Sequence, residues 1–190
     1  MSSRRGGASN KKLRRSKIPD TVCAMVREIS AGGVVLRQIA GIWNVALIEP
    51  QKENSTPAKS PRARSRAVLA LPKGLVDPGE KPIAAAVREV KEETGILAEP
   101  LTKLVDIKYV YSRTWGDGER VFKIVSFYLL RYLLGEIDDL SPDMRIEVKR
   151  ALWVPLDEAD RQLAYSHERK VLRQAQQYLE TPGLAPETEL

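Results

Sequence analysis

The 190-residue sequence contains a single cysteine, Cys23. A lone cysteine forms no internal disulfide, and it excludes a zinc site built from several cysteines. Long hydrophobic runs are also missing, because the most apolar stretch, IVSFYLLRYLLG, is short and is interrupted by Arg131. The basic N-terminus is not followed by an apolar core, so no secretory signal is predicted. We therefore expect a protein of a reducing compartment, by default the cytoplasm, without membrane contact.

Outside its first 20 residues the sequence has no net charge. Residues 1–20 contain seven Lys or Arg and one Asp, and so account for the whole formal charge of +6. A basic arm can contact nucleic acid through counterion release. Without interleaved aromatic residues, however, that signal is weak. We expect a disordered basic tail that either makes a weak nucleic-acid contact or only aids solubility.

The length and composition suit one well-cored domain with tails. Hydrophobic residues make up 43% of the chain and charged residues 29%, as in ordinary globular proteins. Residues 51–66, QKENSTPAKSPRARSR, offer almost nothing to bury, which predicts a flexible basic loop insertion. We expect a single domain over residues 21–181, followed by a C-terminal tail over 182–190.

Residue patterns predict strands on both sides of a central helix. This helix is expected to begin at Pro82, which suits a first helical position, and to end at Gly95, which suits a left-handed cap. A Gly-Asp-Gly turn predicts a hairpin further on. Strands are expected within residues 21–37, 42–50, 67–72, 104–113, 120–132 and 151–155, and further helices within 156–163 and 167–180. This order predicts a mixed β-sheet covered by helices, in the α/β class.

The central helix carries a cluster of acidic residues in the stretch GLVDPGEKPIAAAVREVKEETGI. Glu89, Glu92 and Glu93 project from one side of the helix, because positions three and four apart share a face. Its apolar side is expected to comprise Ile83, Val87, Val90 and Thr94. Like charges at this spacing repel one another, and a divalent cation would reverse that repulsion. Carboxylates at this density suit Mg²⁺ or Mn²⁺ better than an ordinary solvated surface.

The residues around the cluster support a metal site. Gly74 follows an apolar segment, where a backbone carbonyl can serve as a ligand, and a Pro-Gly turn brings Glu80 to the start of the helix. Arg88 lies beside the acidic face, where it can pair with Glu80 and hold the loop against the helix. The other carboxylates then remain free for metal.

The complete spacing from Gly74 to Ile96 resembles the signature of the Nudix hydrolases at every defined position. The resemblance implies an α/β/α sandwich and divalent-metal-dependent cleavage of a nucleoside diphosphate linked to another group. It also implies that Gly74, Glu89, Glu92 and Glu93 are the metal ligands, with Arg88 and Glu80 orienting them. Water made more acidic by the metal would attack phosphorus.

Two glutamates are candidates for the general base of that reaction. One is Glu93 in the signature, and the other is Glu147, because many Nudix hydrolases carry a glutamate shortly before a WVP strand. A solvated loop carboxylate is the alternative interpretation of Glu147. The choice between the two candidates stays open.

Substrate preference is encoded outside the signature. The LPKG lead-in with Lys73 and the later Lys123 resemble the subgroup that contains diadenosine polyphosphate hydrolases and MutT-like enzymes. Tyr111 is placed like a tyrosine of that subgroup that stacks on a base, and Arg113 is a further candidate for phosphate contact. Half-buried strand residues or solvated arginines are the alternatives. We interpret His167 as part of a helix start without a partner.

The resemblance leaves several functions open. Dinucleoside polyphosphates or nucleoside triphosphates are the expected substrates. ADP-ribose, NADH, oxidised purine nucleotides and inositol pyrophosphates are alternatives, as is a non-catalytic nucleotide- or RNA-binding module. Because degenerate relatives usually lose a metal glutamate and this chain keeps all of them, the sequence favours an enzyme. Residues 51–66 are either a lid over polyphosphate or a solvated insertion, and a monomer and a homodimer are both possible.

Overall fold

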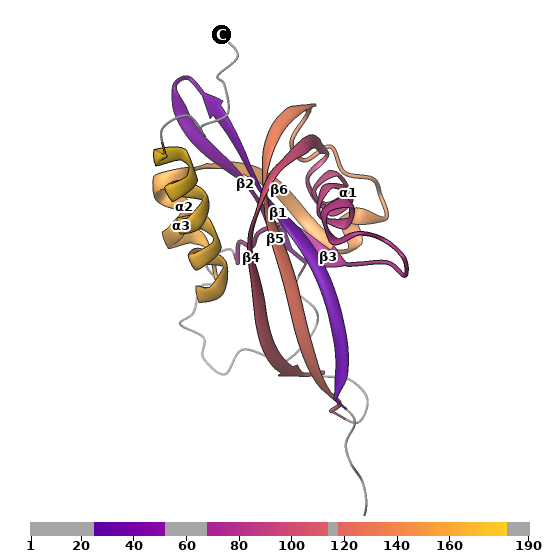
Figure 1. Cartoon of the computed structure of the whole chain (residues 1–190). Coiled ribbons are helices and arrows are strands. Elements are labelled where there is room, and N and C mark those ends of the chain that lie inside the picture. The colour runs from indigo at the N-terminus through magenta and orange to yellow at the C-terminus, as the bar shows by residue number, and fades with distance from the viewer. Residues whose placement is uncertain (1–24, 52–67, 114–117, 182–190) are drawn as a thin grey trace, which may run out of the picture.

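A mixed β-sheet runs through the centre of the chain, with helices on both of its faces (Figure 1). The computed structural model describes residues 25–51, 68–113 and 118–181. The strands are β1 (Val26–Ile39), β2 (Ile42–Pro50), β3 (Lys73–Leu75), β4 (Ile96–Ser112), β5 (Arg120–Gly135) and β6 (Val148–Pro155). The helices are α1 (Pro82–Thr94), α2 (Leu156–Gln162) and α3 (Ser166–Glu180), with a short 3₁₀ helix η1 (Met144–Ile146). In these ranges no helix is both long and apolar enough to cross a bilayer.

The strand order is β4-β5-β1-β2-β6, and β3 pairs with β1 beside this path. Only the β1–β5 pair is parallel, and the other neighbours run antiparallel. β1 is the central strand, and its successive residues Val34 and Val35 are both fully buried because each face of the sheet is covered. The sequence prediction of a mixed sheet is confirmed.

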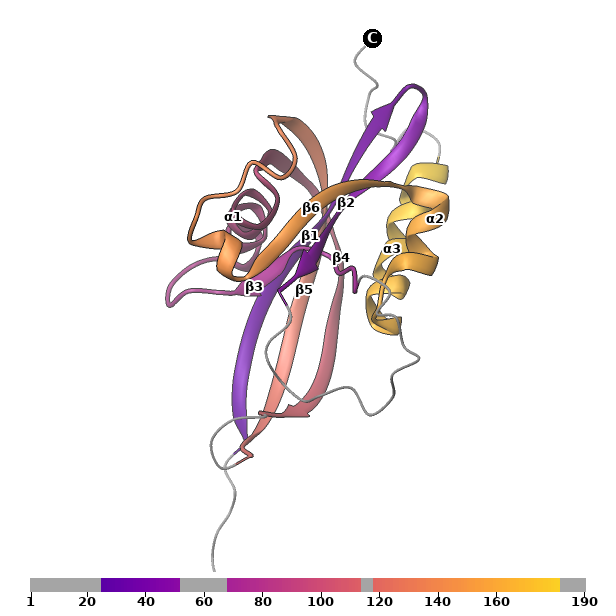
Figure 2. The same cartoon turned by 180° about the vertical axis from the view of Figure 1, so that it is seen from behind.

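The helices lie on opposite faces of the sheet, α1 on one and α2 and α3 on the other (Figure 2), and two apolar layers hold them there. The first layer packs α2 and α3 against one face through residues such as Phe127 and Leu172. The second layer packs α1 against the other face through residues such as Val90 and Leu130. The predicted α/β/α sandwich is therefore confirmed.

Several local expectations need correction. Of the predicted strand over 67–72, residue 67 lies outside the described ranges, and residues 68–72 form only isolated bridges, between Leu69 and Leu163 and between Ala70 and Ile48. Pro72 lacks the N–H that a ladder would need, and β3 begins directly after it. On α1 the expected apolar residue Ile83 is 38% exposed, whereas Glu89 and Glu93 are buried.

The predicted hairpin between 104–113 and 120–132 is confirmed by the antiparallel register of β4 and β5, which ends with Ser112 opposite Arg120. Its connecting residues 114–117 lie outside the described ranges, as do the predicted tails over 1–20 and 182–190. The predicted basic loop also lies outside them, except for Gln51.

Candidate active site

Helix α1 presents the acidic cluster, and local signals fix both of its ends. Pro82 is its first residue, and Gly95 caps it in the left-handed conformation with φ of 80°. Glu89 lies two helical turns after Pro82, and Glu93 lies one turn further on the same side of the helix. Both residues face β3 and are only 8% exposed. On this side of the helix Glu92 remains exposed, whereas Glu89 and Glu93 are buried.

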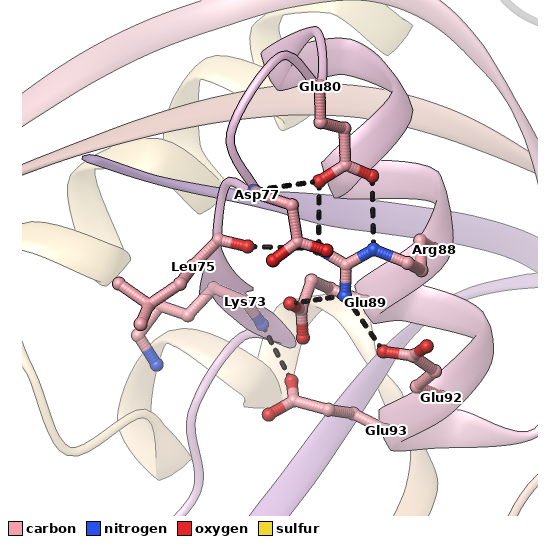
Figure 3. A network of polar contacts seen from close by, with 8 residues as sticks. All are labelled: Lys73, Leu75, Asp77, Glu80, Arg88, Glu89, Glu92 and Glu93. Carbon is pink, nitrogen blue, oxygen red and sulfur yellow. Dashed lines mark hydrogen bonds and ion pairs between the residues drawn. The ribbon is translucent and has the colours of Figure 1, made fainter. Parts of the chain in front are cut away.

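A close approach between β3 and α1 buries the two glutamates. A Cβ atom at Gly74 would overlap the carboxylate of Glu89, so only glycine leaves room for that side chain. The backbone N–H of Lys73 donates to Glu93 Oε2 at 2.6 Å. Gly74 is therefore brought together with both glutamates, all three predicted as metal ligands, and Figure 3 shows the two glutamates beside Lys73.

Arg88 links the loop before α1 to the cluster. Its Nε and Nη2 donate to the two oxygens of Glu80 at 3.0 and 2.9 Å, and Nη2 also donates to the carbonyl of Leu75 at 2.9 Å. The expected Arg88–Glu80 pair is thus present. Nη1 donates to Glu89 Oε1 at 2.8 Å and to Glu92 Oε2 at 2.9 Å (Figure 3). The bidentate pairing with Glu80 fixes the guanidinium at the centre of the acidic face.

The cluster is electrostatically strained without a cation. The pKa of Glu93 is raised to about 8, mainly by burial and in addition by the charges of Glu89 and Glu147, against the opposing charge and N–H of Lys73. Burial also raises the pKa of Glu89 despite the bond from Arg88, again with a contribution from Glu147. In the described part of the chain, no three acidic or histidine side chains are already arranged as a metal site. Carboxylates whose ionised form is disfavoured by burial nevertheless fit a hard divalent cation.

These pKa shifts predict how stability depends on pH in the metal-free protein. A carboxyl whose folded pKa lies above its unfolded value stabilises the fold fully below the unfolded pKa, and this contribution disappears as pH rises through the folded pKa. Glu93 should therefore lower the free energy of unfolding between pH 4.5 and about 8, by about 1.4 kcal/mol for each unit of pKa difference. We expect the Glu93→Gln variant to show a flatter profile than the wild-type chain in thermal unfolding with EDTA.

Magnesium supplies the complementary test of this prediction. A cation that binds the ionised carboxylates favours the folded state more strongly at pH 8 than at pH 5. The midpoint of thermal unfolding should accordingly rise more with Mg²⁺ at the higher pH. An equal rise at both pH values would contradict the assignment of the buried glutamates as ligands.

Glu147, the other candidate base, lies beside η1 in the described structure. It follows the last residue of η1, its side chain is exposed, and its carbonyl accepts a hydrogen bond from the N–H of Gln51 at 2.7 Å. Arg145 holds this turn by pairing with Asp138 at 2.9 Å. The charge of Glu147 acts on both Glu89 and Glu93 and contributes to the raised pKa of each.

Three of the four predicted substrate residues gather around an acid, Glu28, that the sequence did not reveal. Tyr111 donates its hydroxyl to Glu28 Oε2 at 2.9 Å, and Arg113 donates to Glu28 Oε1 at 2.9 Å. Lys123 lies opposite Glu28 in the parallel β1–β5 register, with its Nζ 3.6 Å from Glu28 Oε2. Burial lowers the pKa of Lys123 against the effect of Glu28, and the charge of Lys73 lowers it further. The two lysines therefore lie within electrostatic range of one another.

Lys73 connects the two faces of the sheet. Its N–H reaches Glu93 of α1, whereas its Nζ lies 3.3 Å from Oε1 of Glu168, a fully buried residue of α3. The sequence analysis missed Glu168 as well as Glu28. A signal for Glu168 exists, because it falls on the buried stripe of α3 that continues through Val171, Leu172 and Ala175.

The expectation that His167 belongs to a helix start is confirmed, and its ring has aromatic neighbours. Its ring stacks on Tyr109 of β4, with centroids 5.1 Å apart, and on Tyr165, with centroids 5.5 Å apart. Tyr109 also lies 6.2 Å from the ring of Tyr111. An aromatic column thus extends from the α2–α3 turn onto the sheet face that carries Glu28.

Comparison with known proteins agrees with this site. The family model described as "NUDIX domain" matches residues 40–175. MutT4 of Mycobacterium tuberculosis is 36% identical over 174 residues, covering 89% of this chain and 64% of that protein, so the chain spans less than two thirds of this relative. The asymmetrical bis(5'-nucleosyl)-tetraphosphatase of Sus scrofa is 32% identical over 114 residues, covering 57% of this chain and 69% of that protein.

Solved structures show the same fold. A binary complex of Ap4A hydrolase from C. elegans, 27% identical, aligns with a TM-score of 0.56 over 80% of this chain and 98% of the hydrolase. The family match covers more than half of the chain, including every residue from β3 to the end of α1. The chain belongs to the Nudix hydrolase family.

Proposed function

We propose that the chain is a divalent-cation-dependent pyrophosphohydrolase that cleaves the diphosphate linkage of dinucleoside polyphosphates or nucleoside triphosphates. The observation that carries this proposal is the buried pair Glu89 and Glu93 beneath Gly74, with raised pKa values in the absence of a cation. Mg²⁺ or Mn²⁺, when bound, neutralises charge on the diphosphate and lowers the pKa of water. The ligands that we propose for it are Gly74, Glu89, Glu92 and Glu93.

The remaining residues of the cluster orient these ligands and accept a proton. Arg88 fixes Glu89 and Glu92 by bonds from one nitrogen, and it is itself fixed by Glu80. Proton acceptance from the attacking water falls to Glu93 or Glu147. The buried position of Glu93 and the exposed position of Glu147 are both compatible with this role.

Cationic and aromatic residues beside the cluster support a polyphosphate substrate with a nucleobase. Lys73 and Lys123 lie near the acidic cluster, since the charges of Glu93 and Glu89 act on them respectively. Tyr111 and Arg113 continue the same surface through Glu28. We assign these four residues to substrate binding, with the tyrosine next to the base and the cations next to phosphate.

The names of relatives support nucleotide substrates but do not separate them. Besides the tetraphosphatase of Sus scrofa, the 8-oxo-(d)GTP phosphatase of Mycolicibacterium smegmatis is 37% identical over 103 residues, which cover 54% of this chain and 28% of that protein. A panel of diadenosine tetraphosphate, ATP, 8-oxo-dGTP and ADP-ribose, each with Mg²⁺ and with EDTA, tests the proposal. We expect the highest kcat/KM for a dinucleoside polyphosphate or a triphosphate, whereas no cleavage of any compound would overturn it.

Removing the charge of Lys123 tests whether this residue binds the polyphosphate of the substrate. We expect Lys123→Met to raise KM about tenfold with little change in kcat, because a contact equal in ground and transition states affects binding alone. Lys108→Met is a matched control, since Lys108 is exposed and lies opposite Ile124 in the β4–β5 register, on the other face of the sheet. Equal KM values for both variants in steady-state kinetics would contradict the assignment.

The domain boundaries also remain a proposal. We infer one Nudix domain over residues 21–181, because α1 and α3 pack on opposite faces of the same sheet. Limited proteolysis of the full chain should leave a resistant fragment close to these limits. Rapid cleavage inside β1 or α3 would contradict them.

A further inference from the structure

Glu168 is a buried charge whose position the proposed reaction does not explain. It lies in the first turn of α3, is 0% exposed, and its Oε2 accepts a hydrogen bond from the N–H of Leu71 at 2.9 Å. Its Oε1 accepts no hydrogen bond from the described residues and faces Lys73 Nζ at 3.3 Å. An apolar side chain would fit the surrounding stripe of α3, and burying an ion pair costs desolvation free energy. The charge therefore calls for a functional reason.

Lys73 interacts with two acids from different helices, Glu93 of α1 and Glu168 of α3. Its backbone N–H donates to Glu93, while its ammonium faces Glu168 and the carbonyl of Leu71 at 3.4 Å. The charges of Glu168 and Glu93 both act on this ammonium. Without Glu168, Glu93 would be the stronger remaining counter-ion, and the lysine would compete with a cation for the same carboxylate.

We propose that Glu168 is a positioning residue that holds the Lys73 ammonium on the α3 side of the sheet and so leaves the Glu93 carboxylate to the divalent cation. This inference rests on the proposed function, because it assumes that Glu93 is a ligand. It means that α3, on the opposite face of the sheet from α1, influences the cation affinity of the site on α1. The influence passes through a single side chain, Lys73.

Binding of Mn²⁺ to the full chain, measured by electron paramagnetic resonance of the free ion, tests this role without turnover. Glu168→Gln keeps an acceptor for the N–H of Leu71 but loses the counter-charge of Lys73. We expect it to weaken Mn²⁺ affinity about tenfold, the lower end of the range for outer partners of metal ligands. In Lys73→Met/Glu168→Gln no ammonium remains to compete, and most of the lost affinity should return. Glu180→Gln, an exposed position of the same helix, is the matched control and should bind as the wild-type chain does.

Each outcome of this experiment has one meaning. Unchanged Mn²⁺ affinity in Glu168→Gln would overturn the inference. A double variant that binds Mn²⁺ no more tightly than Glu168→Gln would also overturn it, because the loss would then be structural and independent of Lys73. Should Glu168→Gln not fold, Lys73→Met/Glu168→Leu decides: affinity near the wild-type value supports the inference and a tenfold loss overturns it. A folded wild-type chain that binds no Mn²⁺ would instead refute the proposed function.

Discussion

Replacing Glu93 or Glu92 with glutamine is expected to lower kcat by about a hundred- to ten-thousandfold. Each substitution keeps the volume of the side chain but removes a charge that the cation requires. Glu93 also accepts the N–H of Lys73 at 2.6 Å, a bond that glutamine can preserve through its amide oxygen. The loss should therefore appear in turnover rather than in folding, as measured by steady-state kinetics beside thermal unfolding.

The control for these variants is Glu136→Gln, which changes an exposed acid outside the cluster. It should retain wild-type kcat. Because burial disfavours the charge of Glu93, the Glu93→Gln protein should unfold at a temperature equal to or above that of the wild-type chain at pH 8 without metal. Nearly full activity in both signature variants would refute the assignment of the site.

Gly74→Ala is the second substitution with a large expected effect. The new Cβ would overlap the carboxylate of Glu89, and that carboxylate is the mobile end of a long side chain. The fold can accommodate the methyl group by moving Glu89, so stability should change little. Catalysis should fall about a hundredfold, because a ligand displaced from its required position no longer supports the reaction.

A double variant shows whether the steric conflict is the cause. Glu89→Ala removes the carboxylate that the methyl group would displace, so adding Gly74→Ala to it should cost no further activity. Independent losses in the two variants would mean that Gly74 acts by another route. Circular dichroism of all three proteins distinguishes a displaced side chain from a disrupted fold.

The limits of α1 were predictable because their signals are local. Pro82 and Gly95 act through their own backbone conformations, and both ends agree with the structure. The burial of Glu89 and Glu93 was not predictable from helical periodicity, since it depends on the approach of β3 at Gly74. Periodicity tells which residues share a face but not what packs against that face.

The contacts of Glu28 and Glu168 could not be predicted, because their partners are distant in the sequence. Glu28 meets Lys123 only through the parallel pairing of β1 with β5, and Glu168 meets Leu71 across 97 residues. Neither contact follows from a local pattern, because parallel register and helix docking depend on the whole fold. The stacking of His167 on Tyr109 was unpredictable for the same reason, since Tyr109 lies on β4.

Hydrolysis of the best substrate in ¹⁸O-labelled water, followed by mass spectrometry of the products, tests the central claim most directly. With Mg²⁺ we expect one ¹⁸O atom in a phosphate group of one product, no reaction above background with EDTA, and incorporation at least about a hundredfold slower with Glu93→Gln. Cleavage that proceeds equally in EDTA, or equally in the Glu93→Gln protein, would contradict a divalent-metal site built on the buried glutamates of α1.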